Sequence, residues 1–178
     1  DKQTVLGPFL YLIQPLFTSI TFTIIFNNLA GINTGTVPPF LFNLAGITVW
    51  NYFTACLTGT SNTFGANAGI FGKVYFPRII VPISIVISNL LKFGIQFGIF
   101  IAFYLLYYFQ GAAISLNGLV VFFPLLIIVM GILGLGLGMF ISSLVTKYRD
   151  FSHLIGFGVQ LLMYVSTVDY PIALVKEK

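Results

Sequence analysis

The chain has 178 residues, of which eight are Lys or Arg and four are Asp or Glu. Soluble domains carry about 25% charged residues, whereas this chain carries 7% and is 58% apolar. A single small core cannot hide so much apolar surface. The composition therefore excludes a soluble globular protein and a disordered chain, and the thinly spread net charge of +4 excludes a nucleic-acid binder. An integral membrane protein remains.

Long stretches without a charged side chain indicate membrane-spanning helices. They cover residues 3–72, 79–91, 93–146 and 154–168. A spanning helix needs about 20 apolar residues, whereas a β-barrel would show short alternating segments. We therefore predict an all-α integral membrane protein, with one transmembrane domain over residues 1–178 and about five spans near residues 8–28, 40–61, 79–109, 119–146 and 154–170.

The second predicted span has a polar side, and two spans carry aromatic clusters. The polar side chains either make hydrogen bonds between helices or line a translocation path. The aromatic rings either form an interfacial belt or stack on sugar rings along such a path. The candidate path residues are Trp50, Tyr52, Phe53, Thr54, Thr58, Lys92, Tyr104, Tyr107 and Tyr108.

Lys92 is the one charged residue in the interior of a predicted span, away from its ends. An ionisable group at this depth is a functional hypothesis by default. The side chain either extends to the membrane interface or contacts an anionic substrate or lipid. No acid in the predicted spans is an obvious partner.

The basic residues predict the orientation of the chain. The positive-inside rule places Lys and Arg on the cytoplasmic side. Alternate connections satisfy the rule when the N-terminus is cytoplasmic, through Lys2, Lys73, Arg78, Lys147 and Arg149. Lys176 and Lys178 depart from it, which predicts either a shortened chain or a segment after Pro171 that re-enters the membrane.

Two pairs of glycines have the spacing of helix-packing contacts. Gly94 and Gly98 are four residues apart, as are Gly134 and Gly138. Small residues at this spacing let helices approach closely in lipid, although transmembrane helices are also rich in glycine in general.

Several short motifs, in order along the chain, resemble one family. They are Lys2 to Pro8 followed by Gln14-Pro15, Asn67 to Arg78 with Pro82, Tyr148-Arg149-Asp150 with His153, and Tyr164 to Pro171. Together they resemble ABC-2 type transporter permeases, in particular those that export lipid-linked polysaccharides such as O-antigen, capsule or teichoic acid.

The resemblance implies a permease subunit of an ATP-driven ABC exporter, which moves lipid-linked polysaccharide across the bacterial inner membrane. Such permeases form homodimers, contact membrane lipids and pair with two ATPase subunits. ATP and Mg would be bound by the ATPase, so this chain would hold no cofactor and would not be an enzyme.

The resemblance also assigns roles to three segments. Residues 62–78 would form the cytoplasmic coupling segment that docks on the ATPase, through Asn67, Ile70, Phe71, Lys73, Val74, Tyr75, Phe76 and Arg78. The cytoplasmic loop motif before the fifth span would comprise Tyr148, Arg149, Asp150 and His153. The approach to the outer gate would comprise Ser166, Tyr170 and Pro171.

The chain departs from the family pattern at several points. Family members begin with a cytoplasmic amphipathic helix and continue into re-entrant gate helices and a sixth span, so we expect this chain to be a fragment. Thr167 replaces the usual proline and Asp169 adds a charge near the gate. Lys92 falls where many members carry an acid or a neutral residue, so the resemblance assigns it no role.

Two other functions stay open. One is an ABC-2 permease for another cargo, such as a drug or a lipid. The other is a membrane-embedded channel or enzyme, which would need intramembrane acids or histidines. The interiors of the predicted spans offer only Lys92, which argues against it.

Overall fold

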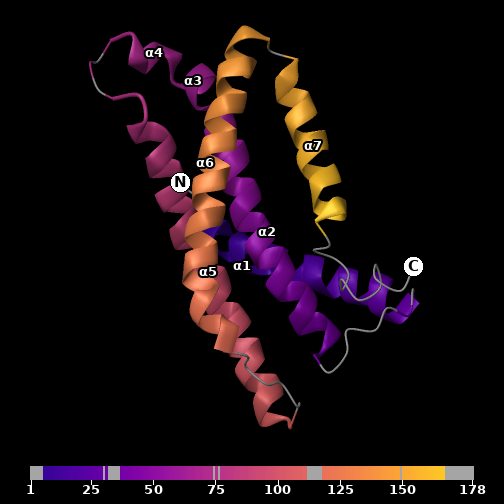
Figure 1. The fold of residues 1–178 in the computed structure, drawn as a ribbon. Helices are drawn as coiled ribbons and strands as arrows, with labels where there is room; N and C mark the ends of the chain where they lie inside the picture. Colours follow the sequence, from indigo (N-terminus) through magenta and orange to yellow (C-terminus); the bar gives the residue numbers. More distant parts are fainter. Residues whose placement is uncertain are drawn as a thin grey trace. The chain divides into compact units, whose positions relative to one another are not determined.

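A computed structural model of the chain describes residues 6–29, 31, 37–73, 75, 77–111, 118–148 and 150–166. Within these ranges every regular element is a helix (Figure 1). The prediction of an all-α protein is therefore confirmed.

The helices follow the charge-free stretches of the sequence. In order, they are α1 (Leu6–Phe22), the π-helix η1 (Thr23–Leu29), α2 (Pro39–Ser61), α3 (Thr63–Ala66), α4 (Ala68–Phe71), α5 (Ile80–Phe109), the 3-10 helix η2 (Gly118–Phe122), α6 (Phe123–Lys147) and α7 (Phe151–Val165).

Within the part of the chain that the structure describes, four helical segments are long and apolar enough to cross a membrane, namely Phe9–Phe26, Pro39–Ser61, Ile80–Phe109 and Phe123–Lys147. The fifth predicted span corresponds to α7, an apolar helix of 15 residues, which is shorter than the roughly 20 residues that a span requires. The end of that predicted span, after Ser166, lies outside the described residues.

The chain divides into two compact units, and α2, α5 and α7 each contribute to both. Unit 1 comprises residues 1–50, 92–117 and 163–178, and unit 2 comprises residues 51–91 and 118–162.

Unit 1 joins η1, α2 and α5 through polar and aromatic contacts. The Asn43 amide donates a hydrogen bond to the Thr23 hydroxyl at 3.2 Å, and the rings of Phe40 and Phe103 meet edge to face at 5.2 Å. The Thr23 hydroxyl itself donates to the Ser19 carbonyl at 2.7 Å. A hydroxyl on this carbonyl competes with the backbone ladder, and it does so at the residue where α1 changes to η1.

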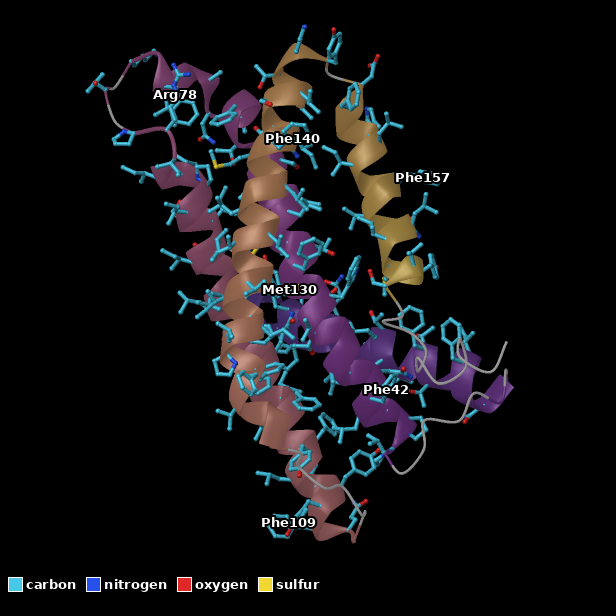
Figure 2. All side chains as sticks on the ribbon, in the orientation of Figure 1. Phe42, Arg78, Phe109, Met130, Phe140 and Phe157 are labelled. Atoms are coloured by element: carbon cyan, nitrogen blue, oxygen red, sulfur yellow. The ribbon has the colours of Figure 1, made fainter. Side chains whose placement is uncertain are left out.

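Unit 2 has its core between α2, α5 and α6. Cys56 is completely buried and Leu57 and Ile127 are nearly so. The opposite faces of the helices are apolar and exposed, as Phe140 on α6 and Phe157 on α7 illustrate (Figure 2). Helices with apolar outer faces suit a lipid environment, because lipid tails cover such surface at no cost.

Candidate functional site

Helices α2 and α6 approach closely because α6 presents small residues to α2. The buried positions of α6 include Gly131, Gly134, Gly138 and Ser142. A Cβ atom at Gly134 would lie 2.8 Å from the Cys56 Cβ, and one at Gly138 would overlap the Thr60 hydroxyl. We call these four α6 residues the small-residue seam.

A hydroxyl of α2 adds a polar contact to the seam. The Thr60 hydroxyl lies 2.7 Å from the Cys56 carbonyl oxygen on its own helix and 3.1 Å from the Gly134 carbonyl oxygen on α6. The predicted packing role of Gly134 and Gly138 therefore agrees with the structure. Gly94 and Gly98 differ, since a Cβ at either would meet nothing within 4 Å.

The predicted coupling segment is attached to the end of this seam. The Phe64 backbone N–H donates a hydrogen bond to the Ser142 hydroxyl at 3.1 Å, and Thr63 is buried beside it. The Asn67 amide donates to the Thr63 carbonyl oxygen at 2.9 Å. The start of the segment is thus held by α6, and Asn67 links α3 to α4.

Several other described residues of the segment are exposed. Ile70 is 52% exposed and Tyr75 is fully exposed, and Lys73 and Arg78 are exposed beside them (Figure 2 labels Arg78). Phe71 is half-buried, and its ring lies 6.1 Å from that of Phe64. Val74 and Phe76 lie outside the described residues.

The structure therefore separates the predicted coupling residues by role. Asn67 and Phe71 make contacts within the segment, whereas Ile70, Lys73, Tyr75 and Arg78 are each exposed and include two positive charges. We call these last four residues the exposed coupling face. Aromatic and apolar side chains beside basic ones are typical of protein-binding surfaces.

Lys92 contacts α1 within unit 1. Its ammonium lies 4.9 Å from the centre of the Tyr11 ring, a distance at which a cation is attracted by the aromatic face. One turn along α5, the Gln96 amide donates to the Tyr11 backbone carbonyl oxygen at 3.3 Å. Lys92 is itself exposed, so the ammonium is accessible from outside the unit.

The other predicted path residues are divided between the two units. Trp50, Tyr52 and Phe53 are buried, and the Thr58 hydroxyl donates to the Thr54 carbonyl on its own helix at 2.7 Å. The candidates of unit 1 are Trp50, Lys92, Tyr104, Tyr107 and Tyr108, and those of unit 2 are Tyr52, Phe53, Thr54 and Thr58. A continuous path through them remains a prediction.

The tyrosines at the end of α5 form an aromatic cluster. The rings of Tyr104 and Tyr108 stack at 6.4 Å, and Phe109 meets Tyr108 edge to face at 6.1 Å. Tyr108 is 56% exposed. Exposed aromatic rings at a helix end are typical of a membrane interface.

The loop motif before α7 is exposed where the structure describes it. Tyr148 lies beneath the Lys147 ammonium, 5.3 Å from the ring centre, and its ring is 6.1 Å from that of Phe151. Asp150 and His153 are exposed. Arg149, Tyr170 and Pro171 lie outside the described residues, and Ser166 is an exposed turn residue after α7.

Three residues of these sites were missed in the sequence: Tyr11, Gln96 and Ser142. Pro15 was a usable signal for the first two. A proline in a helix cannot donate to the carbonyl four residues earlier, here that of Tyr11, and a membrane helix must satisfy such a carbonyl from a neighbour. Ser142 continues the four-residue spacing of Gly134 and Gly138.

No group of three His, Cys, Asp or Glu side chains that could hold a metal ion occurs within the described ranges.

Comparison with known proteins covers almost the whole chain. The chain is 27% identical over 178 residues to a protein of Klebsiella pneumoniae named O-antigen export system permease protein RfbA, and the alignment covers 99% of this chain and 66% of that protein. It is 21% identical over 166 residues to a protein of the same name from Myxococcus xanthus, with 93% and 61% aligned. The chain thus spans slightly less than two thirds of the length of these relatives.

The family profile described as ABC-2 type transporter matches residues 2–177. This match includes all the helices described above. The apolar helices of the structure fit it, since members of this family are multi-pass integral membrane proteins. The chain therefore belongs to the ABC-2 type transporter family.

Proposed function

We propose that this chain is the membrane-spanning part of a permease subunit that exports a lipid-linked polysaccharide of the O-antigen class across the bacterial inner membrane. The observation that carries the proposal is the similarity along 99% of the chain to a protein named as an O-antigen export permease. The permease would act as a homodimer with two ATPase subunits, which would bind ATP and Mg.

The exposed coupling face supports the proposed ATPase partner. A docking surface must be accessible and must also be attached firmly to the helices that it moves. Ile70 and Tyr75 are accessible, and the Phe64–Ser142 hydrogen bond attaches the segment to α6. A push on the coupling face would thus reach the small-residue seam between α2 and α6.

The ATPase contact can be tested by co-purification of the full-length permease with its ATPase. Truncation of an exposed aromatic at the centre of an interface typically costs about 2 kcal/mol or more, which is about thirtyfold in affinity. We expect Tyr75→Ala, and Lys73→Glu together with Arg78→Glu, to abolish co-purification and ATP-dependent export. Phe109→Ala is the matched control, because Phe109 is 81% exposed at the other end of α5. Normal co-purification of both coupling variants would contradict the docking role.

The cargo can be tested in cells. Deletion of the gene should remove the surface polysaccharide and cause lipid-linked glycan to accumulate inside. A normal surface glycan in the deletion strain would argue for an ABC-2 permease with another cargo, such as a drug or a lipid.

A further inference from the structure

Lys92 is a cation on an apolar helix, and the contact that the structure shows for its ammonium is the Tyr11 ring. No carboxylate pairs with it among the residues that the structure describes, where Asp150 is the single acid. Its surroundings are lipid-like, since Ile95 on α5 is 56% exposed and Leu10 on α1 is 60% exposed. A lysine in such a setting is costly unless an anion or water reaches it.

Pro15 explains why Tyr11 and Lys92 meet. Pro15 lies inside α1 and has no N–H to offer the Tyr11 carbonyl. The Gln96 amide donates to that carbonyl instead, at 3.3 Å. Because Lys92 and Gln96 are one turn apart, they lie on the same face of α5. The Gln96 hydrogen bond therefore holds the Tyr11 ring beside the ammonium.

The length of α5 allows Lys92 to lie near the level of the lipid headgroups. The 30 residues of α5 span about 45 Å, which exceeds the hydrocarbon core by about 15 Å. Lys92 lies about 18 Å from the start of the helix. A placement with the excess length at the Ile80 end puts its backbone within about 3 Å of the hydrocarbon boundary, from which the side chain can extend to the headgroups.

We propose that Lys92, positioned by Tyr11 and Gln96, binds the phosphate group of a membrane lipid, and that the exporter's lipid-linked cargo presents this phosphate. An ammonium is a standard partner of phosphate. The Tyr11 ring keeps the ammonium at the surface between α1 and α5 without neutralising its charge. Only the identity of the lipid rests on the proposed function, because phosphate binding requires neither the ATPase nor transport.

The proposal can be tested by equilibrium binding to the full-length permease in nanodiscs of phosphatidylcholine. The probes are a radiolabelled polyprenyl monophosphate and, as the matched ligand without phosphate, the corresponding polyprenol. We expect Lys92→Gln to weaken binding of the phosphate by about tenfold or more, the usual effect of a lost charged hydrogen bond. Binding of the polyprenol should not change, and Lys92→Arg should retain the affinity of the unmodified chain.

Two further variants test the positioning and the location. Tyr11→Phe keeps the aromatic ring and should bind normally, whereas Tyr11→Leu should weaken binding about threefold. Lys147→Gln is the matched control, because Lys147 also lies over a tyrosine ring, at 5.3 Å, but at the end of α6. It should leave binding unchanged.

Competition with phosphatidylglycerol identifies the source of the phosphate. If phosphatidylglycerol displaces the polyprenyl monophosphate only when it is in large excess, the result supports the lipid-linked cargo as the source of the phosphate. If phosphatidylglycerol competes as well as the polyprenyl monophosphate itself, and binding of both depends on Lys92, the result supports the phosphate site but overturns the assignment to cargo. Equal affinity of Lys92→Gln and the unmodified chain overturns the site itself. The site is also overturned if Lys92→Gln weakens binding but the double variant with Asp169→Asn binds normally, because Asp169 would then be the partner of Lys92. Melting curves of each variant in the same nanodiscs confirm that the folded protein is compared.

Discussion

At the scale of single residues, Gly138 leaves no room for a side chain. A Cβ there would overlap the Thr60 hydroxyl and lie 2.9 Å from the Leu57 carbonyl oxygen. We expect Gly138→Ala to destabilise the protein by about 1–3 kcal/mol, the usual cost of overpacking a tight core. Thermal unfolding of the purified protein in detergent measures this effect.

Gly136 on the same helix is the control, because a Cβ there meets nothing within 4 Å. Since alanine favours a helix over glycine by up to about 1 kcal/mol, Gly136→Ala should be neutral or slightly stabilising. Equal destabilisation by both substitutions would contradict the close approach of α2 and α6.

At the scale of elements, one hydrogen bond attaches α3 to α6. Ser142→Ala removes the acceptor of the partly buried Phe64 N–H, and the loss of a partner for such a donor costs toward the lower end of about 1–3 kcal/mol. We expect amide exchange at Phe64 to rise about tenfold or more, with weaker coupling of ATP hydrolysis to export. Hydrogen-exchange mass spectrometry over residues 62–72 measures the first effect.

Ser143→Ala provides a neighbouring control, because the exposed Ser143 hydroxyl donates only to the Phe140 carbonyl of its own helix, at 2.7 Å. It should leave exchange at Phe64 unchanged. Identical exchange in the Ser142 and Ser143 variants would show that the hydrogen bond does not hold the segment.

At the scale of the whole molecule, α5 should place its two ends on opposite sides of the membrane. The basic residues predict that the Lys73 end is cytoplasmic. We therefore expect Lys73→Cys to react with an impermeant maleimide only after the cells are opened, and Gln110→Cys to react in intact spheroplasts. The unmodified chain is the control, since its single cysteine, Cys56, is completely buried. Labelling of both variants from one side would contradict a spanning α5.

The sequence alone was sufficient for the helical class, the positions of the long helices and the family resemblance. The physical reason is that a membrane span must satisfy its own backbone and be apolar over about 20 residues. Both requirements are local, so the charge-free stretches reveal them. The four-residue spacing of Gly134 and Gly138 is also a local feature, so this pair of the seam could be inferred from the sequence.

The partners across helices were decided only by the tertiary structure. Spacing indicated that Gly94 and Gly98 resemble Gly134 and Gly138, yet among the described residues only the second pair lies against a neighbouring helix. Likewise, Lys92 was recognisable as an anomaly, but Tyr11 lies 81 positions earlier in the chain. A contact of this kind depends on which faces of two helices meet, and an apolar sequence leaves many faces equivalent.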